Sequence, residues 1–171
     1  VGLFSLERNF GSSKVCEMKQ EQTSSSVTVA QQLAHGIVNA CPEKEALGQQ
    51  VGQRLITDVL GICIAARHEF YVKAALSAFE QEGNCTVFGF EQKCGVEGAA
   101  FVNGIAAHGE DFDDTYEGGP VHAGVVIVPA LLAAAERHAL SGEDVLRGVA
   151  IGVEVMCRLC AVAPTRVHKA G

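Results

Sequence analysis

Apolar residues recur every third or fourth position along much of the chain, which is the spacing that places them on one face of a helix. A first stripe begins at Val29, and Pro42 separates it from a second, longer stripe because proline ends one helix and fits the first turn of the next. A third helix is predicted over 68–82, with Gly83 as its stop. The stripes comprise Val29, Leu33, Ile37 and Cys41 in the first helix and Leu47, Val51, Leu55, Val59 and Ile62 in the second.

Small residues dominate the pattern farther along the chain. Gly95–His108 is rich in alanine and glycine, and we expect a helix whose neighbours approach its backbone closely. The glycine and proline residues of 109–121 predict a loop. The next helix is predicted to begin at residue 123 or at Pro129 and to run to His138, with the proline in its first turn or at a kink.

The last predicted helix is apolar on nearly every face. It starts at Ser141–Asp144, which is close to a capping box, and runs to about residue 162. Such a helix belongs in the centre of a bundle. Thr86–Phe90 is the best strand candidate, and strands and helices do not alternate. The pattern therefore predicts an all-α helical bundle with at most one short extended segment near 85–90.

Residues 1–26 differ from the rest in having no sustained period. They are rich in serine and glutamine, and we expect a flexible tail, which would be a native segment, a tag remnant or a targeting segment. Residues 27–171 are expected to form one helical domain. Gly171 follows soon after the most apolar helix, which needs neighbours on every side. We therefore expect the domain to be truncated at its C-terminal end and inactive alone.

Composition excludes several classes of protein. With 48% hydrophobic residues among 171, the chain can form a packed core and is not a disordered protein. The formal net charge of −7 offers no basic face to nucleic acid, and no apolar run approaches the ~18 residues of a membrane span. The seven cysteines predict reduced thiols, in the cytoplasm or alternatively in the mitochondrial matrix. For Cys157 and Cys160, which have CxxC spacing, we expect core packing rather than zinc or redox chemistry.

Chemically active residues concentrate between His108 and His122. Five carboxylates and two histidines fall within these fifteen residues of a chain in which 19% of residues are charged. Crowded carboxylates must be paired, hydrogen-bonded or protonated. Three interpretations fit the residue types: acid/base chemistry by a histidine with a carboxylate, a divalent metal site formed by Asp111, Asp113 and Asp114, or a solvated loop whose carboxylates cap helix ends. The metal interpretation lacks the residue order of an EF-hand.

Several segments in a fixed order give the chain a resemblance to a known family. They are Ala99–His108, Asp111–Thr115, His122 and Val128–Leu132, with Leu55–Gly61 and Gly152–Glu154 as further matches. Through these segments the chain resembles the MmgE/PrpD family, which contains 2-methylcitrate dehydratase, cis-aconitate decarboxylase and iminodisuccinate epimerase. Two features differ from many relatives. His122 is followed by Ala-Gly rather than Pro-Ser, and Tyr116-Glu-Gly-Gly stands in place of a tryptophan-containing loop.

The resemblance implies a helical domain that is followed in the chain by a smaller α/β lid, with the active site between the two. It implies small di- or tricarboxylate substrates, and no metal, iron–sulfur cluster or other cofactor. Members commonly form homodimers through the helical domain, so a homodimer is expected, and neither nucleic acid nor a membrane is expected as a partner. The alternative from another class of protein is a non-catalytic helical dimerisation module.

By the same resemblance, Asp111 and His122 line the site and are the catalytic residues. Dehydration, decarboxylation and epimerisation of a polycarboxylate each move a proton at a carbon next to a carboxylate, and histidine exchanges protons near neutral pH. Asp111 would orient His122 or bind a substrate hydroxyl. Asp113 and Asp114 are expected to be structural, through helix caps and loop hydrogen bonds.

Overall fold

The computed structural model describes residues 27–40, 46–79 and 82–162. The chain divides into two units, Val1–Ala40 and Cys41–Gly171, and each is described by itself. The predicted tail at 1–26 and the predicted truncated end lie outside the described residues.

The described part of the first unit is helix α1, Val29–Asn39. Its start is a capping box, as the polar residues before the stripe favour. The Oγ1 atom of Thr28 accepts a hydrogen bond from the Gln31 backbone N–H at 3.2 Å, and the Gln31 side chain accepts one from the Thr28 N–H at 2.9 Å. Two N–H groups that the helix itself cannot pair are thereby satisfied. The predicted first helix is confirmed.

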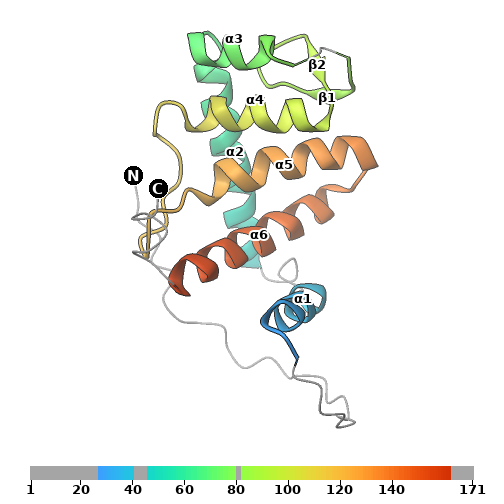
Figure 1. Cartoon of the computed structure of the whole chain (residues 1–171), viewed down its shortest axis with the longest axis vertical. Coiled ribbons are helices and arrows are strands. Elements are labelled where there is room, and N and C mark those ends of the chain that lie inside the picture. The colour runs from blue at the N-terminus through green and yellow to red at the C-terminus, as the bar shows by residue number, and fades with distance from the viewer. Residues whose placement is uncertain (1–26, 41–45, 80–81, 163–171) are drawn as a thin grey trace. The chain divides into compact units, whose positions relative to one another are not determined.

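The second unit holds five helices and one two-stranded sheet within its described residues (Figure 1). The elements are α2 (Ala46–Ala66), α3 (Phe70–Ser77), β1 (Cys85–Thr86), β2 (Lys93–Cys94), α4 (Val96–His108), α5 (Ala123–His138) and α6 (Gly142–Val162). The predicted class, a mostly helical domain, is confirmed.

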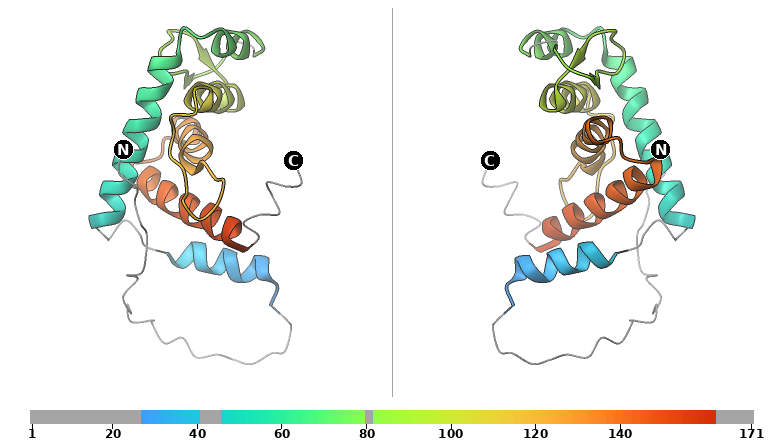
Figure 2. Two further views of the ribbon diagram at one scale, coloured as in Figure 1. Left: turned by 90° about the vertical axis from the view of Figure 1, so that its left-hand side faces the viewer. Right: turned by 90° about the vertical axis from the view of Figure 1, so that its right-hand side faces the viewer.

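Helices α3 to α6 stack in chain order, and α4, α5 and α6 run in alternating directions, as the colours in Figure 1 show. Helix α2 runs across one side of this stack and contacts α4, α5 and α6 (Figure 2). The loop between α4 and α5 emerges at one end of the stack, and the small sheet lies at the other end of α4. The loop that carries the histidines and carboxylates is therefore anchored at both ends by packed helices, α4 and α5.

Small apolar side chains fill the core between α2, α4 and α5. Its fully buried members include Val59, Cys63, Val102 and Val128. Pro129 lies inside α5 rather than at its start. Proline has no N–H to give to the carbonyl one turn earlier, which is that of Val125. That carbonyl faces Gly104 of α4, where the two backbones approach closely.

The helix at 68–82 and the strand at 86–90 were predicted with the wrong bounds. The helix ends at Ser77, and the strands cover Cys85–Thr86 and Lys93–Cys94, which pair antiparallel. Gly83 does not end the helix. It allows the chain to pass close to Cys94, because a Cβ at residue 83 would collide with the Cys94 carbonyl oxygen. The sheet depends on this approach between residues distant in sequence, which no local period signals.

Helix α6 is less enclosed than its composition predicts. Val145, Val149 and Cys160 are buried, whereas Leu159 and Val162 are exposed. Among the described helices, α6 contacts α5 and α2.

The cysteines that the structure describes are free thiols. Burial raises the pKa of the Cys63 thiol to about 12, and burial also raises the pKa of Cys157. Such thiols are poor nucleophiles, because the reactive form is the thiolate. The burial of Cys160 and the raised pKa of Cys157 agree with the core packing expected for this pair. None of the described helices has the length and hydropathy that crossing a membrane requires.

Candidate functional site

The end of α4 reverses the chain sharply. The Asp111 N–H donates to the His108 carbonyl at 3.0 Å, and Asp111 has a φ of 57°, in the left-handed region. Aspartate adopts this conformation more readily than most residues with a side chain. The reversal brings residue 113 back against the last turn of α4.

Asp113 lies at the centre of the loop. Its side chain is fully buried, and its Oδ2 atom is 3.0 Å from Nδ1 of His108 and 3.0 Å from Nδ1 of His122. Its Oδ1 atom is 3.2 Å from the same His108 nitrogen. One carboxylate therefore stands between two imidazole rings, whose centroids are 4.9 Å apart.

A tight turn delivers His122 to this carboxylate. The Tyr116 N–H donates to the Val121 carbonyl at 2.9 Å, and the Val121 N–H donates to the Gly119 carbonyl at 2.8 Å. His122 follows at once as the N-cap residue of α5. Its side chain is 27% exposed, against 78% for Asp111, and its Nε2 atom lies 3.9 Å from Oδ1 of Asp111. The ring thus faces a buried carboxylate with one nitrogen and an exposed one with the other.

The Nδ1 atom of His122 is buried and makes no aligned hydrogen bond within the described residues. It lies 3.0 Å from Oδ2 of Asp113, which is a hydrogen-bond distance, but the two groups are not aligned for a hydrogen bond. Buried polar atoms are rarely left unpaired, and the nearest acceptor for this nitrogen is the carboxylate oxygen of Asp113.

Asp114 has a separate, structural role. Its carboxylate oxygens accept the Gly124 N–H at 2.9 and 3.1 Å, which satisfies an unpaired donor at the start of α5. Burial raises the pKa of the Asp114 carboxyl, and the Asp113 and Asp58 carboxylates add to the rise, whereas the Gly124 N–H and His122 oppose it. The predicted capping role of Asp114 is confirmed.

Four residues are arranged so that a cation could bind: one donor atom each from His108, Asp111, Asp113 and His122 lie within 4.8 Å of one another. We call this set the His–Asp cluster. The arrangement also fits acid/base chemistry, because each imidazole already faces a carboxylate. The metal interpretation from sequence named Asp114 as a ligand, but its oxygens are used by Gly124 and it lies outside the cluster.

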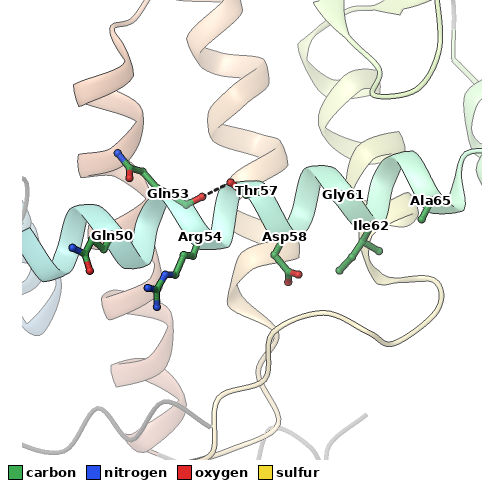
Figure 3. Close-up of a pocket in the computed structure, with 8 residues that line it drawn as sticks. All are labelled: Gln50, Gln53, Arg54, Thr57, Asp58, Gly61, Ile62 and Ala65. Atoms are coloured by element: carbon green, nitrogen blue, oxygen red, sulfur yellow. Dashed lines mark hydrogen bonds between the residues drawn. The ribbon is translucent and has the colours of Figure 1, made fainter. Parts of the chain in front are cut away.

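A surface hollow lies along one face of α2, and none of the four cluster residues lines it (Figure 3). Arg54 and Asp58 project from the same side of the helix. Asp58, which lines the hollow, raises the pKa of Asp114 through its charge. The hollow is open and lined by a single helix: Gln50, Gln53, Arg54, Thr57, Asp58, Gly61, Ile62 and Ala65.

The loop thus brings together Asp111 and His122, which the sequence singled out. His108 and Asp113 lie beside them. The sequence singled out no chemical role for His108 alone, and it offered Asp113 only as a metal ligand or as a structural residue. Their contact joins residues five apart, which is no helical spacing, and it depends on the left-handed turn at Asp111. The one available signal was the density of histidine and aspartate in the segment.

Paired histidines and carboxylates on a loop between two helices are the residue types that acid/base sites use. The family of the chain comes from comparison with known proteins. The model of the MmgE/PrpD N-terminal domain matches residues 13–170. The chain belongs to the MmgE/PrpD family.

Several curated relatives share part of the sequence. The cis-aconitate decarboxylase-like protein oryM of Aspergillus oryzae is 30% identical over 115 residues, which is 61% of this chain and 24% of the relative. The cis-aconitate decarboxylase of Aspergillus terreus is 36% identical over 91 residues, 50% of this chain and 18% of the relative. The human cis-aconitate decarboxylase is 40% identical over 80 residues, 41% of this chain and 16% of the relative. The matches span less than a quarter of each relative. No solved structure gives a significant match.

Proposed function

We propose that this chain is the N-terminal part of an MmgE/PrpD-type lyase or isomerase that acts on a small di- or tricarboxylate. The observation that carries the proposal is the position of His122. Its ring lies between the buried Asp113 and the exposed Asp111, with Nε2 on the more open side. A partly exposed imidazole that is oriented by a carboxylate is a suitable general acid or base.

Among the family's reactions, decarboxylation of cis-aconitate has the most support, because the relatives compared above carry that name. In that reaction the bond to one carboxyl carbon breaks, CO₂ leaves, and the electron pair remains on an allylic carbanion. One proton then adds to carbon. In our proposal the His122 imidazolium gives this proton from Nε2 and becomes neutral, and Asp111 orients the ring or the substrate.

The cluster alone is not enough for such a substrate. Asp111, Asp113 and Asp114 are carboxylates, and a polycarboxylate bound beside them needs cationic groups to hold its charge. We propose that these groups and a covering lid come from other parts of the complete enzyme, and that the 171-residue chain alone is inactive.

The test is an assay of the complete protein and of the 171-residue chain on cis-aconitate, 2-methylcitrate and iminodisuccinate, with products followed by NMR. We expect turnover of at least one acid by the complete protein and none by the chain alone. His122→Ala and Asp111→Asn should each lower turnover by about 10²–10⁴-fold, the usual cost of losing a general acid or base. Helical content by circular dichroism should not change.

Two further arms can contradict the proposal. Variants that turn over every acid like the parent would remove Asp111 and His122 from the mechanism. Loss of activity with EDTA, restored by a divalent cation, would make the His–Asp cluster a metal centre instead of the organic acid/base site proposed here.

We also propose that the domain pairs with a second copy of itself. Exposed apolar side chains on the second unit support this, among them Phe112, Val126 and Leu159. Light scattering of the purified protein should give twice the monomer mass. A dimer that converts none of the candidate acids would favour the non-catalytic dimerisation module.

A further inference from the structure

Asp113 is placed to decide which nitrogen of His122 carries the reactive proton. Its Oδ2 atom is 3.0 Å from Nδ1 of His122, and its side chain is fully shielded from water. An ionised carboxylate accepts hydrogen bonds and donates none. The neutral ring therefore gains by carrying its hydrogen on Nδ1, which leaves Nε2 as the free base on the side of Asp111.

His108 is placed to hold Asp113 in that position. Its Nδ1 atom is 3.0 Å from Oδ2 and 3.2 Å from Oδ1 of the same carboxylate. Half of its side chain is exposed, so it lies on the outer side of the buried carboxylate. A carboxylate that is hydrogen-bonded to His108 on one side and lies against His122 on the other has little freedom to rotate.

We propose that Asp113 and His108 are positioning residues for His122: Asp113 fixes the Nδ1–H tautomer, and His108 fixes Asp113. The catalytic consequence rests on the proposed function. When the His122 imidazolium gives its Nε2 proton to the substrate carbon, the Nδ1–H remains on the ring and faces Asp113. The ring is left neutral, and Nε2 takes up a new proton from the solvent.

The first test is spectroscopic and needs no substrate. Two-bond ¹H–¹⁵N correlations of the histidine rings report which nitrogen carries hydrogen in the neutral form. In the chelator-treated protein, at a pH where the rings are neutral, His122 is expected to show the Nδ1–H tautomer. In Asp113→Asn, an amide N–H₂ can face the ring, and the tautomer is expected to shift towards Nε2–H. A parent His122 already in the Nε2–H form, or an unchanged tautomer in the variant, overturns the proposal.

The second test uses two variants of His108 with matched size but different hydrogen bonding. An asparagine amide can donate from near the Nδ1 position of histidine, whereas leucine cannot. His108→Asn is therefore expected to keep the tautomer of His122 and most of the turnover. His108→Leu is expected to lose the tautomer preference and roughly 10-fold in kcat, and Asp113→Asn about 10²-fold, with KM changed less than about threefold. His138→Leu, on an exposed turn at the far end of α5, is the control and is expected to behave like the parent.

The outcomes separate the two proposals. If His108→Asn and His108→Leu lower kcat equally and shift the tautomer equally, the role of His108 is only structural and the inference fails. If the tautomer responds as expected while no candidate acid is turned over, the positioning holds and the proposed function fails.

Discussion

Helix α4 carries buried polar groups in two regions that are built differently. The side chain of Asn103 is hydrogen-bonded to backbone on both sides: its Nδ2 donates to the Thr86 carbonyl at 2.9 Å, and its Oδ1 accepts the Phe88 N–H at 2.9 Å. At the C-terminal end of α4, the contacts join titratable side chains, and one buried nitrogen is left without an aligned partner.

This difference separates a polar group that holds the fold from one that can do chemistry. An amide paired on both sides with backbone has one arrangement and no proton to exchange. The His–Asp cluster contains side chains that can gain or lose a proton, and its hydrogen-bond pattern depends on which atoms carry hydrogen. Unsatisfied or changeable polar groups cost stability, and they are usually found where a site needs them.

The largest expected effect on stability is at Asn103. Asn103→Ala leaves the half-buried Thr86 carbonyl and Phe88 N–H without this partner, which should lower the free energy of unfolding by about 2–4 kcal/mol. Asp113→Asn is nearly isosteric and should cost under about 1 kcal/mol while changing turnover. Urea denaturation of both variants and of Ser77→Ala, an exposed control, measures the contrast. An Asn103→Ala protein as stable as the control would refute the structural role of the amide.

A smaller effect is expected where the loop meets α5. A Cβ at Gly124 would collide with Oδ1 of Asp114 and lie 2.7 Å from Cδ1 of Leu55. Gly124→Ala should therefore lose the Asp114 cap and cost about 1–3 kcal/mol of unfolding free energy. Gly61→Ala in α2 is the matched control, because nothing lies within 4 Å of its Cβ, and alanine there should stabilise by about 0.5–1 kcal/mol. If the melting temperatures of Gly124→Ala and Gly61→Ala move in the same direction, a Cβ at residue 124 does not collide with Asp114 and Leu55.

The sequence predicted what local patterns control. The helix at α1 followed from apolar spacing, α4 from its run of small residues, and α6 from its capping box and apolar composition. The family motif pointed to Asp111 and His122. The two-residue strands could not be predicted, because Gly83 fits against Cys94 only after the chain has folded back. The pairing of His108 with Asp113 depends on the left-handed turn at Asp111, and aspartate at that position gives no distinctive signal.

The smallest effect is a pH dependence with opposite signs at two helix starts. Burial raises the pKa of Asp114 in the folded protein, so the folded state holds that proton more tightly than the unfolded state does. Stability contributed by this group is then present at low pH and falls as the pH rises from about 4, the pKa of an unfolded aspartate. Asp144 is the control. The Ser141 hydroxyl and N–H lower its pKa, so its contribution is present at high pH and falls as the pH drops below about 4.

The measurement is urea unfolding of the parent, Asp114→Asn and Asp144→Asn between pH 3 and 7. The parent should lose stability relative to Asp114→Asn as the pH rises, and gain it relative to Asp144→Asn over the same range. Taking differences against each variant cancels the titration of the remaining carboxylates. Equal slopes for the two variants would mean that Asp114 is as well solvated as the exposed Asp144. The cap at the start of α5 would then lie outside the low-dielectric surroundings that Asp113 and His122 share.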